Sequence, residues 1–364
     1  MAAKICDLEG GTAAMLTSSG QAANFFAVFN IASNGDHVVA SSAIYGGTYN
    51  LFAVTMKRMG VEFTFVSPDA TEDELRAAIR PNTKAVFGET IANPALTVLD
   101  IEKFAKVAHE AGVPLIVDNT FATPINCRPF EFGADIVTHS TTKYMDGHGS
   151  AVGGCIVDSG RFDWAASGKF DCLCTPDESY HGVNYYERFG LEGAYITKAT
   201  AQLMRDFGCT QSPQSAFLLG LGLESLHVRM ERHCSNALAV AKFLKSHPLV
   251  TWVKYPSLEG DKYYDLTRKY MPKGSCGVVS FGVKGGRAAA EKFMKNMKLG
   301  AIETHVADAR TCCLHPASAT HRQMNDAELE AAGVSPDLIR YSCGIESAQD
   351  LIADLDQALR SIEN

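Results

Sequence analysis

Lys143 is the residue around which the chemically useful side chains of this sequence gather. It follows the apolar run 134–137, and the hydroxyl residues Ser140 and Thr142 stand three and one positions before it. A lysine amine that can lose its proton can attack a carbonyl and form a Schiff base, and the neighbouring hydroxyls can bind a phosphate. These properties together describe a site for pyridoxal phosphate, an aldehyde that carries a phosphate. Taken alone, the segment favours the simpler interpretation of an exposed lysine on a polar loop.

Asp118 adds a carboxylate to this candidate site. It ends the apolar run 114–117, which predicts a buried strand, and open parallel sheets hold their ligands at the carboxyl ends of their strands. A buried carboxylate there can keep a pyridine nitrogen protonated, so that the ring can accept electrons. The alternative is a turn residue or helix cap at the end of the strand.

The stretch 17–26 supplies an anion site. Small residues lead directly into an apolar helix, so the backbone N–H groups of Gly20 and Gln21 would face an incoming phosphate. Ser19 could instead be a simple N-cap. The three features follow one another as phosphate helix, ring-nitrogen carboxylate and lysine, and this ordered set is stronger evidence than any one member.

The sequence resembles the Cys/Met-metabolism family of pyridoxal-phosphate enzymes, which includes cystathionine synthases and lyases, methionine γ-lyases and O-acetylhomoserine sulfhydrylases. Seven motifs that span the chain carry the resemblance: 19–21, 44–48, 89–94, 117–120, 139–144, 315–318 and 340–346. The resemblance implies the type I fold of pyridoxal-phosphate transferases, which is similar to that of aspartate aminotransferase.

The same resemblance implies roles for individual residues. Catalysis is assigned to Lys143, Tyr45 and Asp118. Contacts with pyridoxal 5'-phosphate are assigned to Ser19, Gly20, Gln21, Tyr45, Asn93, Asp118, Ser140, Thr142 and Lys143. Binding of the amino-acid substrate is assigned to Arg340, Asn93 and Thr311. Tyr45 would stack on the cofactor ring and assist departure of the γ-substituent, and Glu89 would position the surrounding loop; without the resemblance, Tyr45 could be a surface turn residue and Arg340 part of a surface ion pair.

Within the family, the sequence favours an O-acetylhomoserine sulfhydrylase. The Ser-Tyr-His-Gly element at 179–182 and the segment that follows it through Phe189 resemble an insertion in these enzymes, and Gly47 stands where methionine γ-lyases carry a cysteine. The implied reaction is γ-replacement on O-acetyl-L-homoserine by sulfide or methanethiol, giving homocysteine or methionine and acetate. Two alternatives stay open: elimination of the γ-lyase type, and an N-terminally truncated, non-catalytic relative that acts as an assembly partner.

Assembly is a further expectation from the resemblance. Family members are dimers or tetramers with active sites at subunit interfaces, and an N-terminal arm with a Tyr-x-Arg motif reaches the cofactor phosphate of the neighbouring subunit. No counterpart of this arm stands in the sequence. We therefore expect a homo-oligomer, a dimer or tetramer, whose phosphate affinity, tetramer assembly and activity depend on whether it can do without this arm.

The composition argues against several kinds of partner and site. A net charge of −8 without a basic run argues against nucleic-acid or anionic-membrane partners. Eleven cysteines, without a signal sequence or a long apolar span, predict a reducing cytoplasm. The paired cysteines at 172/174 and 312/313 lack a second spaced pair, so we expect no metal site.

The elements that must position these residues alternate along the chain. A helix is predicted at 2–9, before a strand at 12–17. Strands at 37–41, 61–66, 84–88 and 114–117 then alternate with helices at 48–59, 71–79 and 101–108. This alternation predicts an α/β fold with a mainly parallel sheet and helices on both faces. We expect a cofactor-binding large domain over 1–220 and a smaller α/β domain over 221–364.

Overall fold

The computed structural model describes residues 1–319, 322, 325–326 and 334–363, which form two compact units. The first unit comprises 1–93, 98–146 and 150–221; the second comprises 94–97, 147–149 and 222–364. The division falls inside helix α10 (Pro213–Ser246). The domain boundary at 220/221 stays a prediction.

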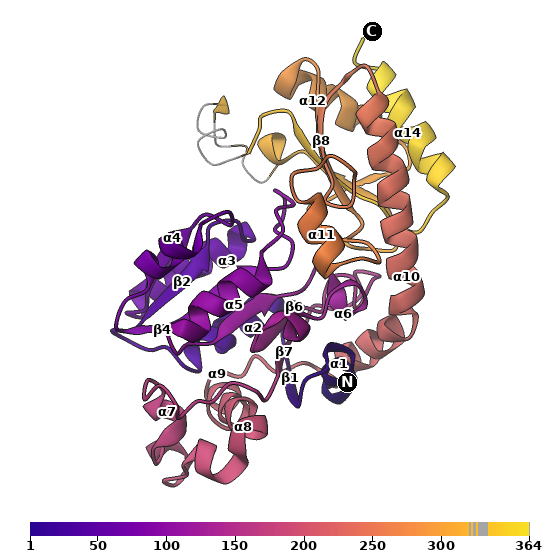
Figure 1. Ribbon diagram of the computed structural model, residues 1–364. Helices are drawn as coiled ribbons and strands as arrows, with labels where there is room; N and C mark the ends of the chain where they lie inside the picture. Colours follow the sequence, from indigo (N-terminus) through magenta and orange to yellow (C-terminus); the bar gives the residue numbers. More distant parts are fainter. Residues whose placement is uncertain (320–321, 323–324, 327–333, 364) are drawn as a thin grey trace. The chain divides into compact units, whose positions relative to one another are not determined.

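A seven-stranded sheet forms the centre of the first unit (Figure 1). Its strands are β1 (Ala13–Thr17), β2 (His37–Ser41), β3 (Glu62–Val66), β4 (Thr83–Glu89), β5 (Leu115–Asp118), β6 (Ile136–Ser140) and β7 (Gly154–Asp158). The spatial order is β1-β7-β6-β5-β4-β2-β3, and β7 alone pairs antiparallel with its two neighbours. The predicted, mainly parallel sheet is therefore confirmed.

Helices cover both faces of this sheet. Every residue of β2 and of β7 is buried, which requires cover on both sides of the strands. The helices of the unit are α1 (Ala2–Glu9), α2 (Gly20–Phe29), α3 (Gly46–Asn50), α4 (Glu72–Ala78), α5 (Ile101–Glu110), α6 (Thr123–Asn126), α7 (Asp171–Cys174), α8 (Tyr185–Lys198) and α9 (Arg205–Phe207). Short π-helical segments follow α3 and α8, over Leu51–Met56 and Ala199–Met204.

The segment between β7 and α8 is more ordered than its turn-rich composition suggests. It contains α7 and a short 3₁₀ helix at Glu178–Tyr180. Its Trp164 is fully buried and stacks on Tyr195 of α8, with ring centroids 5.1 Å apart. Helix α8 itself is interrupted at Gly190, whose φ of 66° suits glycine. Aromatic packing, which local composition does not reveal, therefore anchors this segment.

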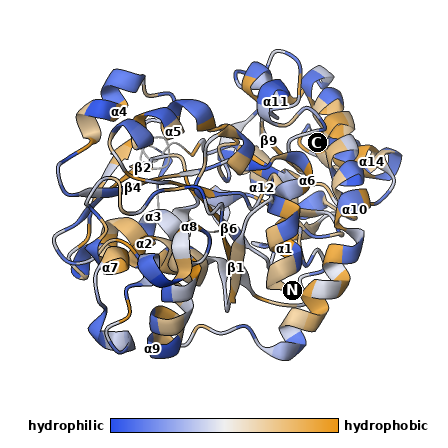
Figure 2. Ribbon diagram, turned by 60° about the horizontal axis from the view of Figure 1, so that its bottom comes forward, coloured by the Kyte–Doolittle hydropathy of each residue, from blue (hydrophilic) through white to orange (hydrophobic). Residues whose placement is uncertain are grey.

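The second unit is a five-stranded sheet with helices packed against it. Its strands are β8 (Val250–Lys254), β9 (Val278–Val283), β10 (Ala301–Ile302), β11 (Cys312–Leu314) and β12 (Leu338–Ser342), in the order β10-β11-β12-β9-β8. The helices among its described residues are the second part of α10, α11 (Tyr264–Tyr270), α12 (Gly286–Asn296) and α14 (Ala348–Arg360). Figure 2 shows polar and apolar residues interspersed along α10, as expected of a helix with one buried face. The core joins residues of α10, β9, α12 and α14.

Three further observations concern cysteines, metals and membranes. All eleven cysteines are free. Within the described ranges, no group of three or more His, Cys, Asp or Glu side chains is arranged to hold a metal ion. None of the described helices is long and apolar enough to cross a membrane.

Candidate active site

Lys143 lies in a tight turn that directly follows β6. Its backbone N–H donates to the carbonyl of Ser140 at 3.2 Å, and its side chain is half-buried. Thr142 fixes the turn to the start of β7, because its hydroxyl accepts from the Gly153 N–H at 3.0 Å and donates to the Gly153 carbonyl at 3.2 Å. The lysine is thus held at the carboxyl end of a parallel strand, as expected. The Thr142 hydroxyl has this structural role in addition to any contact with a ligand.

The N-terminus of α2 lies against Ser140. A Cβ atom added at Gly20 would lie 2.6 Å from the Cβ of Ser140, so glycine is required for this close approach. Ser19 caps the helix, since its Oγ accepts from the Ala22 N–H at 3.1 Å. The first N–H groups of a helix, here those of Gly20 and Gln21, have no acceptor within the helix. This end of the site can therefore bind an anion.

Asp118 is fixed at the end of β5 by hydrogen bonds to both of its carboxylate oxygens. Oδ1 accepts from the backbone N–H of Thr120 at 3.0 Å and from its hydroxyl at 2.5 Å, and Oδ2 accepts from Nδ2 of Asn24 at 3.1 Å. The Oδ1 of Asn24 accepts in turn from the Thr138 hydroxyl at 2.6 Å. A carboxylate held in one orientation fits the ring nitrogen of pyridoxal phosphate. Asn24 and Thr120 were not singled out by their spacing in the sequence.

Glu89 positions the backbone around Tyr45 and Asn93. Its Oε1 accepts from the Tyr45 N–H at 2.7 Å. Burial raises the pKa of Glu89 well above its usual range, and the charge of Asp118 adds to this rise, while hydrogen bonds from the Tyr45 and Asn93 N–H groups oppose it. The Tyr45 side chain is half exposed. The contact agrees with the positioning role expected for Glu89.

A buried polar cluster lies behind these groups and was missed by the sequence analysis. Oε1 of Glu9, on α1, is 2.5 Å from Nε2 of His139 and accepts from Nδ2 of Asn119 at 3.0 Å. All three side chains are buried. His139 immediately precedes Ser140, and Asn119 immediately follows Asp118. Because a buried histidine needs a polar partner, His139 was the available signal for this cluster.

Arg340 and Thr311 belong to the second unit. Arg340 lies in the middle of β12, not at its start, and is 6% exposed. Its Nη2 donates to the carbonyls of Thr304 and His305 at 2.9 and 3.0 Å. The Thr311 hydroxyl donates to Glu346 at 2.8 Å and accepts from the Gly344 N–H at 2.8 Å. The guanidinium is thus held by backbone carbonyls, whereas Thr311 organises the turn around Glu346.

Comparison with known proteins assigns the family. The family model described as "Cys/Met metabolism PLP-dependent enzyme" matches residues 1–360. The chain belongs to this family. Its membership confirms the family and the pyridoxal-phosphate cofactor that were inferred from the sequence motifs.

Relatives within the Cys/Met-metabolism family extend over the whole chain. An O-acetyl-L-homoserine sulfhydrylase from Leptospira meyeri is 44% identical over 99% of this chain and 83% of its own length. A homocysteine synthase from Schizosaccharomyces pombe is 48% identical over 98% of this chain and 83% of its own length.

A solved structure supports the predicted fold. A crystal structure from Campylobacter jejuni, assigned provisionally as an O-acetylhomoserine (thiol)-lyase, has a TM-score of 0.93 and 38% identity. It covers 99% of this chain and 85% of the crystallised chain, and it contains N'-pyridoxyl-lysine-5'-monophosphate. The predicted fold class, the type I fold of pyridoxal-phosphate transferases, is confirmed.

Proposed function

We propose that this chain is an O-acetyl-L-homoserine sulfhydrylase. It replaces the acetate of O-acetyl-L-homoserine with sulfide or methanethiol and gives homocysteine or methionine. The observation that carries the proposal is the match, over nearly the whole chain, to enzymes named O-acetyl-L-homoserine sulfhydrylase and homocysteine synthase. The lysine, carboxylate and anion site at the carboxyl edge of the first sheet support it.

The residues of the first unit fit pyridoxal phosphate. When bound, the cofactor supplies an electron sink for negative charge at the substrate Cα. Lys143 would be its covalent partner, and the fixed carboxylate of Asp118 would hold the ring nitrogen. Tyr45 would stack on the ring, and Asn93 would donate to its oxygen. Its phosphate would be held by groups at the start of α2 and at the end of β6 with the turn that follows it, namely those of Ser19, Gly20, Gln21, Ser140 and Thr142.

Arg340 binds the substrate in the γ-replacement, and Lys143 transfers its protons. The guanidinium of Arg340 holds the substrate α-carboxylate through two parallel hydrogen bonds, with Asn93 assisting and Thr311 positioning the adjoining turn. This orientation decides which bond to Cα is broken. The Lys143 amine removes the α-proton and then moves a β-proton. Tyr45 assists departure of acetate, after which the sulfur nucleophile adds at Cγ.

Gly47 provides a structural reason to prefer replacement over the lyase alternative. A Cβ atom at Gly47 would lie 2.5 Å from Cε1 of the Tyr45 ring. The cysteine that methionine γ-lyases carry at this position would therefore require the Tyr45 ring to move.

We further propose that the protein is a homo-oligomer, a dimer or tetramer, in the cytoplasm. The family resemblance supports the assembly. All eleven cysteines are free, which suits a reducing compartment.

The test is a product analysis of the cofactor-loaded protein with O-acetyl-L-homoserine and either sulfide or methanethiol. We expect equimolar acetate and homocysteine, or acetate and methionine. Ammonia and a 2-oxo acid as the main products would favour the lyase alternative. No turnover of a folded, cofactor-loaded protein would favour the non-catalytic one.

A further inference from the structure

Asn24 is a buried amide that joins four elements of the first unit. It lies in α2, four residues and so about one turn after Gly20, and it is 2% exposed. Its Oδ1 accepts from the hydroxyl of Thr138 in β6 at 2.6 Å. Its Nδ2 donates to Oδ2 of Asp118 in β5 at 3.1 Å and to the hydroxyl oxygen of Thr48 in α3 at 3.3 Å. One side chain thus ties the helix proposed for the phosphate to the carboxylate proposed for the ring nitrogen.

The orientation of the Asn24 amide follows from its partners. An ionised carboxylate can only accept hydrogen bonds, so the Nδ2 donor must face Asp118, and Oδ1 is left to face Thr138. The Thr48 hydroxyl accepts from Asn24 and donates in turn to Oε1 of Gln21 at 3.0 Å. These hydrogen bonds all run from Thr138 towards Asp118 and Gln21, and hydrogen bonds in such a chain strengthen one another. Reversal of the amide would place an oxygen against the carboxylate.

Asp118 has a second carboxylate beside it. Glu89 ends β4 and pairs in register with Asp118 at the end of β5, and two neighbouring carboxylates resist being ionised together. Burial raises the pKa of Glu89, and the charge of Asp118 raises it further. Asp118 accepts two hydrogen bonds from Thr120 on Oδ1, and among the described residues Asn24 is the only donor to Oδ2. This donor favours the arrangement in which the negative charge stays on Asp118.

We propose that Asn24 is a positioning residue that keeps the charge of the Glu89–Asp118 pair on Asp118 and thereby keeps the ring nitrogen of the cofactor protonated. This role rests on the proposed function, in which Asp118 contacts that nitrogen. Asn24 acts through Asp118 and not by contact with the reacting atoms. Without the Nδ2 donor the ionised form of Asp118 is less stable, so the ring nitrogen has a weaker partner and loses its proton at a lower pH.

The test is a pH titration of the ring nitrogen in protein loaded with pyridoxal phosphate that carries ¹⁵N in its ring. The ¹⁵N chemical shift, measured by solid-state NMR, reports whether this nitrogen is protonated, and it requires neither substrate nor turnover. Asn24→Leu keeps the approximate size of the side chain and removes the donor. Because one hydrogen bond to a charged group is lost, we expect the proton to leave at a pH lower by about one unit or more than in the unmodified protein.

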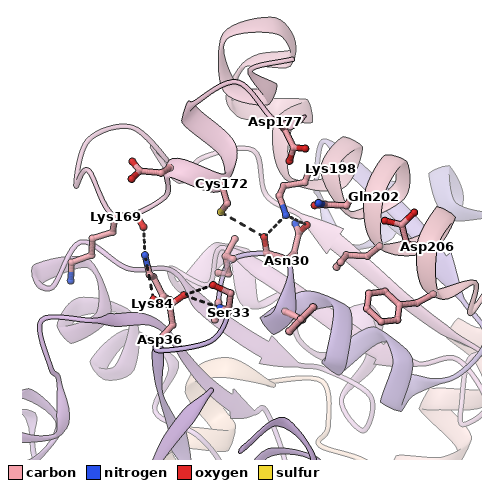
Figure 3. A pocket seen from close by; sticks show the side chains of 16 residues that line it. Asn30, Ser33, Asp36, Lys84, Lys169, Cys172, Asp177, Lys198, Gln202 and Asp206 are labelled. Atoms are coloured by element: carbon pink, nitrogen blue, oxygen red, sulfur yellow. Dashed lines mark hydrogen bonds and ion pairs between the residues drawn. The ribbon is translucent and has the colours of Figure 1, made fainter. Parts of the chain in front are cut away.

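Asn30→Leu is the matched control. Asn30 is a buried amide at the opposite end of the same helix, where its Nδ2 donates to the carbonyl of Tyr195 at 2.9 Å and its Oδ1 accepts from Lys198 at 3.4 Å (Figure 3). Its loss should lower the stability of the protein, as that of Asn24 does, and leave the ring-nitrogen titration unchanged. Glu89→Gln, which cannot ionise, should leave the titration unchanged as well.

Thr138→Val is an independent variant, because it removes the donor that orients the amide and leaves Asn24 in place. We expect a shift in the same direction as in Asn24→Leu, but a smaller one. The proposal alone is overturned if both variants titrate like the unmodified protein, or if Asn30→Leu or Glu89→Gln shifts the titration as far as Asn24→Leu. An unprotonated ring nitrogen in the unmodified protein at neutral pH would overturn it together with the Asp118 contact on which it rests.

Discussion

Successive side chains of β6 point to opposite faces of the sheet. Neighbouring residues of this strand therefore contact different partners. Thr138 donates to Asn24 and Ser140 lies against Gly20, whereas His139 between them contacts Glu9. Glu9 also holds Asn119, the neighbour of Asp118. The carboxylate of Glu9 thus contacts residues at the ends of both β5 and β6, next to residues that we propose bind the cofactor. Glu9 is therefore a positioning residue.

Glu9→Ala should weaken cofactor binding as well as stability. It removes the acceptor of His139 and of Asn119, which costs about 1–3 kcal/mol for each buried group left without a partner. The dissociation constant of pyridoxal phosphate, measured by equilibrium dialysis of the folded fraction, should rise at least tenfold.

Asp354→Ala is the matched control for that variant. Asp354 is a buried carboxylate of the second unit that accepts from the N–H groups of Lys298, Leu299 and Gly300. This change should lower stability without altering cofactor dissociation. Equal cofactor loss in both variants would show that Glu9 acts through stability alone.

Arg340→Lys should separate substrate binding from turnover. A lysine keeps the positive charge but cannot form the two parallel hydrogen bonds of a guanidinium. We expect the KM for O-acetyl-L-homoserine to rise at least tenfold, with a smaller change in kcat. Arg310→Lys, an exposed position of the same unit that pairs with Asp308, is the control. An unchanged KM in Arg340→Lys would contradict the carboxylate role.

The sequence predicted single site residues better than their partners. Asp118 ends one apolar run and Lys143 lies in the turn after the strand that another run predicts, where a parallel sheet exposes functional groups, so both could be found. Asn24, Thr120 and Glu9 could not, because their contacts join segments that lie far apart in the chain or depend on side-chain orientation. Local spacing does not contain that information.

At the scale of elements, β2 depends on a buried histidine that joins three strands. Nδ1 of His37 is 2.8 Å from the Thr83 hydroxyl of β4, and Nε2 is 2.9 Å from the Thr64 hydroxyl of β3. Burial lowers the pKa of His37 from 6.5 to about 4, and the charge of Arg80 adds to this shift. The folded protein therefore favours neutral His37.

Protonation of His37 at low pH should lower the free energy of unfolding. Because the pKa is lower in the folded state, its contribution is fully present above pH 6.5 and is lost as the pH falls towards 4. We expect this histidine to account for a fall of about 1–3 kcal/mol in the free energy of unfolding across that range.

The measurement is urea unfolding of the unmodified protein and of His37→Gln at several pH values. The difference between the two proteins isolates His37 from His233, whose pKa burial also lowers to about 4. His181→Gln, at an exposed position, should keep the full acid sensitivity. An identical pH dependence in His37→Gln and the unmodified protein would disprove the assignment.

Elements with a regular apolar period were predictable, and elements held by distant packing were not. Helix α5 buries Ile101, Phe104, Ala105, Val107 and Ala108, the same positions whose spacing predicted it. The segment before α8, by contrast, is ordered by the stacking of Trp164 on Tyr195. Such a contact depends on the completed fold of the first unit.

At the scale of the whole molecule, the motif order proved more informative than any composition measure. Strands β4, β5 and β6 are adjacent and parallel, so the motifs at their ends meet at one edge of the sheet. Charge and hydrophobic content only excluded other classes of protein. The proposal of one cofactor site in the first unit therefore rests on this strand order.

The visible absorption spectrum of the purified chain with pyridoxal phosphate, before and after addition of O-acetyl-L-homoserine, tests the central claim most directly. We predict a band of lysine-bound cofactor that survives desalting, shifts when the substrate is added, and is absent from Lys143→Ala. The proposed site would be contradicted by a band that is lost on desalting, that does not shift when the substrate is added, or that persists unchanged in Lys143→Ala.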